Sequence, residues 1–88
     1  MGREIRDWAL KWIEGSLLSF VENKTPLNIT VGRIRKSVKS YGIKINDLKL
    51  LIDMIEKSPL YLPSIQREEK IAKLKLVREA IKNIIEEK

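Results

Sequence analysis

The 88-residue chain contains neither cysteine nor histidine, and these two absences remove whole classes of function. Without cysteine the chain has no disulfide framework and no zinc–thiolate site, so a small fold must be stabilised by packing alone. Without histidine it lacks the commonest general base and metal ligand, and the usual nucleophile–base pairs of enzymes are excluded as well. We therefore expect no catalytic residue, no metal site and no cofactor.

Glycine is scarce too, and the four glycines stand apart from one another. Neither a phosphate-binding loop nor a dinucleotide fingerprint can form from isolated glycines. The adjacent acids Glu68 and Glu69 would point about 100° apart on a helix, so they do not converge on one site. A serine–lysine pair remains arithmetically possible, but no motif singles one out. The sequence predicts a protein that is not an enzyme.

Long hydrophobic runs are also missing. The chain opens with charged residues where a signal peptide needs an apolar segment, and no apolar stretch approaches the roughly 18 residues of a membrane span. We expect a soluble, cytoplasmic protein that does not bind membranes. Its composition is rich in isoleucine, lysine and glutamate, which is typical of thermophile proteins with heavily charged surfaces.

The residues that are present form four helical patterns with apolar positions three and four residues apart. The sequence predicts a single domain over residues 1–88, with helices at about 3–23, 31–41, 46–57 and 64–86. The breaks carry helix-ending prolines at Pro26 and Pro59, N-capping residues at Thr30, Asn46 and Ser64, and a glycine suited to positive φ at Gly42. Residues 60–62 predict an extended connector or at most a rudimentary wing.

The third and fourth expected helices carry more apolar surface than one buried face requires. Leu50 and Met54 lie outside the main stripe of the third helix, so another element or a partner should cover them. The fourth helix would span roughly 33 Å. It either packs back over the first and third helices, which we favour, or projects and pairs with a second copy in a homodimer.

Helix 3–23 carries two tryptophans one turn apart, Trp8 and Trp12. Core packing is the favoured interpretation, with an anchor for a partner as the main alternative. Binding of the helix to a membrane surface is less favoured because residues 1–24 carry no net charge. Gly15 lies in the same helix and suggests a close approach by a neighbouring backbone. Phe20 and Tyr61 do not form an aromatic platform on which successive bases could stack.

Most of the net charge of +6 comes from residues 25–45, which contain no acid. This segment holds five basic residues, namely Arg33, Arg35, Lys36, Lys39 and Lys44. A surface of this kind suits phosphate binding, because each neutralised phosphate releases condensed counterions. The alternative is a set of ordinary solvated charges, some of them paired with acids of the last helix.

Residues 13–59 resemble the first three helices of winged helix-turn-helix domains, through the segments 26–34 (PLNITVGRI) and 41–49 (YGIKINDLK). The resemblance implies an all-α fold with a helix-turn-helix-like three-helix core plus a long C-terminal helix. It also implies that the third helix enters the major groove while the second lies across the DNA backbone. Lys44, Asn46 and Lys49 would then face bases or phosphates, and the bases of helix 31–41 would hold phosphates. The sequence departs from the family by placing Asp47, Asp53 and Glu56 in the third helix and by lacking a hairpin wing.

The sequence therefore predicts a non-catalytic DNA-binding protein of replication, transcription or chromatin, which grips backbone phosphates through helix 31–41. The alternative is a small accessory subunit that docks on a larger nucleic-acid machine, such as a DNA polymerase complex. In that case Leu50 and Met54 would contact the partner protein.

Overall fold

Amphipathic helices account for most of the chain in the computed structural model, which describes the backbone of residues 2–58 and 60–86 and the side chains of residues 7–58 and 60–85. The described residues form helices α1 (Gly2–Val21), α2 (Leu27–Ser40), α3 (Ile45–Lys57) and α4 (Arg67–Glu86), and they contain no strand. The expected all-α class is confirmed.

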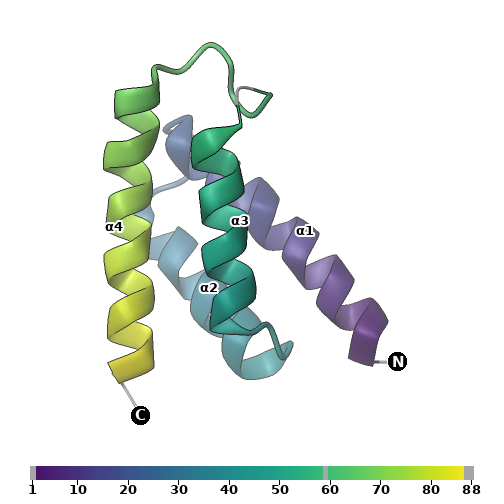
Figure 1. The fold of residues 1–88 in the computed structure, drawn as a ribbon. Coiled ribbons are helices and arrows are strands. Elements are labelled where there is room, and N and C mark those ends of the chain that lie inside the picture. Colours follow the sequence, from purple (N-terminus) through teal and green to yellow (C-terminus); the bar gives the residue numbers. More distant parts are fainter. Residues whose placement is uncertain (1, 59, 87–88) are drawn as a thin grey trace.

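The helices form two helical hairpins, α1–α2 and α3–α4, which lie against each other as two layers (Figure 1). Successive helices run in opposite directions, so α1 begins and α4 ends at the end of the molecule that also holds the α2–α3 turn. Helix α4 contacts all three other helices. It therefore packs back onto the domain, as the favoured interpretation expected, and does not project.

The core lies between the two layers and draws on every helix. Its buried apolar side chains are Ala9, Ile13, Leu17, Phe20, Val21, Ile34, Ile43, Leu48, Leu51, Ile52, Ile55, Leu74, Val77, Ile81 and Ile84. Full burial of one such aliphatic side chain contributes about 1.5–3 kcal/mol. The stripes predicted for α3 and α4 supply most of this set, and they hold the fold together without disulfides.

Helix α2 begins four residues earlier than expected, at Leu27 instead of Val31. Thr30 is therefore inside the helix and does not act as its N-cap, and its hydroxyl donates to the Pro26 carbonyl at 3.1 Å. Ser37 donates likewise to the Ile34 carbonyl at 2.7 Å. Because these short side chains satisfy their hydroxyls on their own helix, they can be buried where a longer polar residue could not.

The apolar spacing of the sequence predicts a buried stripe of Val31, Ile34, Val38 and Tyr41, and the buried face of α2 is rotated from it. Thr30, Ile34 and Ser37 are buried, whereas Val38 and Tyr41 are only half-buried. The apolar spacing of the sequence could not reveal this rotation, since it counts threonine and serine as surface residues.

Two helix ends rely on residues in the left-handed backbone region. Asn23, at φ 66°, follows α1 while the Lys24 amide donates to the Ser19 carbonyl at 2.8 Å and the Asn23 amide donates to the Phe20 carbonyl at 3.0 Å. This hydrogen-bond pair is the Schellman ending of a helix. Gly42, at φ 71°, follows α2, and the positive φ expected there is confirmed.

The expected N-caps of the last two helices are replaced by other residues. Helix α3 starts at Ile45 after Lys44, so Asn46 and Asp47 stand in its first turn and make no cap. Helix α4 starts at Arg67, three residues after Ser64. The acids of the first turns, Asp47 among them, still suit the positive ends of the helix dipoles.

The α3–α4 connector, residues 60–66, is a series of turns and not a wing. Lys70 of α4 is buried to all but 5% of its surface, and its ammonium donates to the carbonyls of Ser58, at 3.3 Å, and of Tyr61. The Tyr61 hydroxyl donates to Glu14 Oε2 of α1 at 3.2 Å. These hydrogen bonds hold the connector against α4 and α1.

Gly15 is exposed, and a Cβ added there would meet nothing within 4 Å. The close backbone approach expected at this residue is therefore wrong. Among the described helices, none combines the length and the apolarity needed to cross a membrane.

Candidate functional site

The acid-free segment of residues 25–45 places its basic side chains on different sides of α2. Lys36 and Lys39 are exposed and lie one turn apart on the same side of the helix, and Lys44 is exposed in the α2–α3 turn. We call these three residues the basic end. Arg33 and Arg35 are half-buried, and two helical positions separate them by about 200° around the axis. The expected single cationic flank thus divides into an exposed part and two lateral arginines.

Arg33 lies against α1. Its Nη1 donates to Ser16 Oγ at 3.1 Å, and the Ser16 hydroxyl donates to the Trp12 carbonyl at 2.9 Å. This arginine is held at the contact between α1 and α2 instead of extending into solvent, so the sequence-based expectation of its position is corrected.

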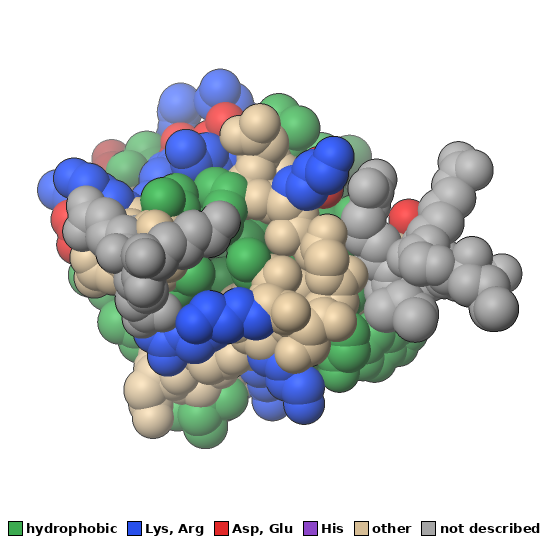
Figure 2. Space-filling view, turned by 90° about the horizontal axis from the view of Figure 1, so that it is seen from below, with side chains coloured by type: hydrophobic (Ala, Val, Ile, Leu, Met, Phe, Trp, Pro, Cys, Tyr) green, Lys and Arg blue, Asp and Glu red, His purple; other side chains and the backbone are tan. Residues whose placement is uncertain are grey.

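The end of the molecule that carries the α2–α3 turn is rich in cations. Seen from this end, lysine and arginine side chains lie at several places among hydrophobic and other polar atoms, and acidic atoms are few (Figure 2). Helix α2 ends here, next to the start of α3. An extended anion could therefore touch side chains of more than one helix on this face.

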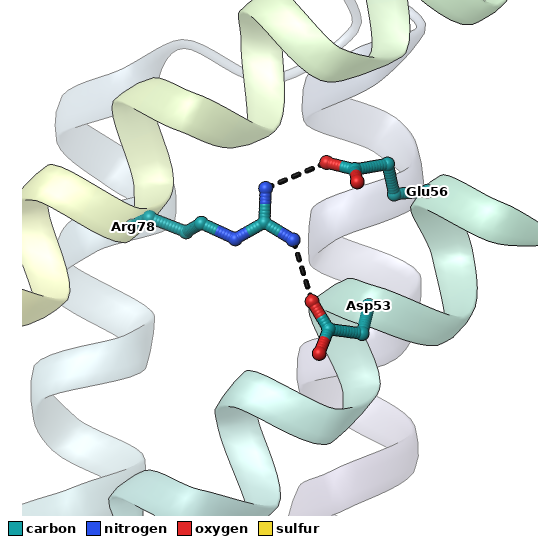
Figure 3. A network of polar contacts seen from close by, with 3 residues as sticks. All are labelled: Asp53, Glu56 and Arg78. Atoms are coloured by element: carbon teal, nitrogen blue, oxygen red, sulfur yellow. Dashed lines mark hydrogen bonds and ion pairs between the residues drawn. The ribbon is translucent and has the colours of Figure 1, made fainter.

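Two of the three acids that distinguish α3 from a recognition helix, Asp53 and Glu56, turn toward α4. Arg78 of α4 donates to Asp53 Oδ1 at 2.7 Å and to Glu56 Oε1 at 2.6 Å (Figure 3). Desolvation alone would lower the pKa of Arg78, but the hydrogen bonds to Glu56 and Asp53 outweigh it and raise this pKa. Two of the three acids of α3 are thus compensated within the fold.

The remaining predicted contacts of α3 are split between two surfaces. Asn46 is exposed in the first turn, close to the basic end along the chain. Lys49 is exposed but lies in a hollow of about 190 Å³ between α3 and α4, together with Asp53, Arg78 and Ile81. Lys49 therefore lies on the side of α3 that faces α4.

Leu50 and Met54 are 65% and 50% exposed. The described residues therefore cover them only in part, and of the two alternatives, another element of the chain or a partner, the first does not supply a full cover. Together with Leu10 of α1 and with Leu51 they line an apolar groove of about 240 Å³. A wider hollow of about 600 Å³ continues from Leu50 and Met54 along α3. We call this surface the α1–α3 groove.

Three charged residues lie at the α1–α3 groove, namely Lys11, Glu14 and Asp47. Asp47 Oδ2 is buried and has no hydrogen-bond partner among the described atoms. A buried carboxylate oxygen without a donor is costly, so this atom would be stabilised by a donor supplied from outside.

Three aromatic rings from α1 and from the end of α2 form a cluster that the sequence analysis did not anticipate. Trp8 and Trp12 stack at 5.6 Å between ring centroids with 16° between planes, and the Tyr41 ring meets them edge-on at 5.7 Å and 5.9 Å. Trp8 is 56% exposed, so core packing does not describe it. The i, i+4 spacing of the tryptophans is visible in the sequence, but their meeting with Tyr41 depends on how α1 packs on α2. We call these residues the aromatic cluster.

The described residues contain no group of acids that could hold a metal ion. No protein-family model matches the chain, and comparisons with curated proteins and with solved structures find no similar protein. Its function must therefore be argued from its own residues.

Proposed function

We propose that this protein is a non-catalytic DNA-binding protein that grips backbone phosphates at its basic end. The observation that carries the proposal is the exposure of Lys36, Lys39 and Lys44 on a segment that contains no acidic residue from 25 to 45. Lysine ammonium groups on such a surface bind phosphates as point charges and release counterions, without needing any particular base sequence.

The position of the basic end also favours phosphate contact. The short α2–α3 turn with its positive-φ Gly42 supports the resemblance to helix-turn-helix domains that segments 26–34 and 41–49 suggest. Asn46 stands exposed at the start of α3, where that family places contacts to bases. Because Arg78 compensates Asp53 and Glu56, these acids repel an approaching phosphate less than free carboxylates would.

Reversal of the three charges tests the proposal. A variant with Lys36→Glu, Lys39→Glu and Lys44→Glu should lose duplex binding in a fluorescence anisotropy titration, since each lysine contributes a phosphate contact. For the unchanged protein, three such contacts predict a slope of about −3 in a plot of log K against log salt concentration.

A matched control separates local contact from net charge. Lys57→Glu, Arg67→Glu and Lys75→Glu together change three exposed bases elsewhere and also bring the net charge from +6 to 0, because each reversal removes two charges. This control should retain most of the duplex affinity. Equal loss in both variants, or tight binding that ignores salt, would contradict binding at the basic end.

The second candidate function is docking on a larger protein through the α1–α3 groove, and the exposure of Leu50 and Met54 favours it. The apolar lining of the groove, with Glu14 and Asp47 among its residues, favours as occupant the apolar face of a helix that also carries a lysine or arginine. The basic end would then only bring the protein close to nucleic acid.

Leu50→Ser with Met54→Ser tests this second candidate. Both side chains are largely exposed, so the double variant should fold as the unchanged protein does by circular dichroism. If docking is the function, it should no longer co-purify with the partner from native cells, while duplex binding in vitro stays the same. Unfolding of the variant would show instead that the two residues stabilise the core.

A further inference from the structure

The aromatic cluster lies next to the basic end. Tyr41 directly follows α2, so Lys39 and Lys44 stand two and three residues from it. At 3.8 Å between consecutive Cα atoms, their Cα atoms are at most about 11 Å from that of Tyr41. Cations therefore border the aromatic rings on the side of the α2–α3 turn.

A further cation borders the cluster on the opposite side. Arg33 of α2 is hydrogen-bonded to Ser16, which follows Trp12 by four residues, a rise of about 6 Å along α1. The guanidinium of this half-buried arginine therefore lies against α1 about 12 Å along the helix from Trp8, which is the rise of eight residues.

Trp8 is the ring that a ligand could reach. It covers Trp12 with one face, yet more than half of its surface is exposed. Tryptophan is enriched at interfaces because its indole combines a large apolar face with a polar N–H group. The rigid stack on Trp12 also holds the indole in place, so binding would cost little side-chain entropy.

We infer that this strip binds single-stranded nucleic acid, with a base stacked on Trp8 and neighbouring phosphates held by Lys39 and Lys44. The inference rests on the proposed function and makes it more specific. In a duplex the faces of the bases are covered by their neighbours, so an indole on a convex surface can stack only on an unpaired base. Phosphate contacts alone would not distinguish single strands from duplex.

The test compares three labelled probes of equal length by fluorescence anisotropy: oligothymidylate, oligouridylate and a mixed-sequence duplex. The unchanged protein should bind at least one of the single strands more tightly than the duplex. Trp8→Ala should weaken single-strand binding by about 5- to 100-fold, the cost of one lost stacking contact, and change duplex binding by less than about twofold. Trp8→Phe, which keeps an aromatic ring, should recover most of the lost affinity.

The matched control is Leu76→Ala, which trims an exposed apolar side chain of α4 and should change no affinity. A second measurement does not depend on Trp8→Ala folding well. In Trp12→Phe, Trp8 is the remaining tryptophan of the chain, and its emission should be quenched when oligothymidylate binds.

The possible failures are distinguishable. If the duplex binds at the basic end but Trp8→Ala changes no affinity and Trp8 emission is not quenched, the inference is overturned and the proposed function stands. If neither single strands nor duplex bind, both are overturned. If Trp8→Ala instead abolishes capture of a protein partner and leaves nucleic-acid binding unchanged, the aromatic cluster is a protein contact and the inference is again wrong.

Discussion

Single residues hold the α3–α4 connector in place, and Lys70 is the clearest example. Its aliphatic stem is buried, while its ammonium reaches two backbone carbonyls, one of them at the C-terminal end of α3. That end of a helix carries partial negative charge, so a cation there is favourable. A buried lysine is rare in proteins and needs such hydrogen bonds.

Lys70→Met keeps the aliphatic stem but removes the ammonium group. The carbonyls of Ser58 and Tyr61 then lose the hydrogen bonds that this group donates. We expect a loss of about 1–3 kcal/mol in the free energy of unfolding, measured by urea denaturation. Lys75→Met, at an exposed position of the same helix, should change it by no more than about 0.5 kcal/mol. Equal effects in the two variants would show that the Lys70 hydrogen bonds do not stabilise the fold.

Tyr61 gives a second prediction at this scale, because its hydrogen bond to Glu14 raises its pKa above the ordinary value of 10.0. A phenol whose pKa is raised by folding contributes stability that is fully present below the unfolded pKa and is lost as the pH rises through the folded pKa. In Tyr41→Phe, where Tyr61 is the remaining tyrosine, ultraviolet absorbance should show tyrosinate forming at a higher pH than it does when Glu14→Gln is added. Titration at the same pH in both would mean that the hydrogen bond is absent in solution.

At the scale of the helices, two glycines with opposite roles provide a matched comparison. Gly15 occupies a regular, exposed position in α1, so Gly15→Ala should stabilise the protein by about 0.5–1 kcal/mol through reduced backbone entropy. A Cβ added at Gly42 would also meet nothing within 4 Å, but the backbone there has a φ of 71°. Gly42→Ala should therefore destabilise by about 1–2 kcal/mol. Thermal unfolding of both variants checks the signs, and two shifts in the same direction would refute this assignment.

The sequence predicted the buried face of a helix well where one strong apolar stripe determines it, as in α3 and α4. It failed at the start of α2, because the pattern gave Thr30 the role of a cap and hid the burial of Thr30 and Ser37. At the candidate site, the sequence predicted that Lys36 and Lys39 are exposed, which follows from their position outside the stripe. It could not place Arg33 on Ser16 or join Tyr41 to the tryptophans, since both contacts depend on the register between α1 and α2.

For the whole molecule, the burial of α4 bears on oligomeric state. The stripe that could have paired with a second copy is largely inside the domain. Of the exposed large apolar residues of α4, Leu76 lies on a different side of the helix from Ile71 and Ile85, and these two stand fourteen residues apart. Such an arrangement lacks the continuous seam of a coiled coil. We predict a monomer of 10.3 kDa by sedimentation equilibrium at micromolar concentration. A stable dimer would show that another surface, with the α1–α3 groove the first to examine, pairs two copies.

The direction of the helices has a practical consequence for how the protein is handled. Helix α1 begins and α4 ends at the same end as the α2–α3 turn, whereas the connector of residues 60–66 lies at the opposite end (Figure 1). An affinity tag or bead attached at the start of α1 or at the end of α4 would lie near the basic end and would obstruct the binding of a long nucleic acid there. Attachment through the connector would leave that end pointing away from the support, so the choice of anchoring point can decide whether a capture experiment recovers nucleic acid at all.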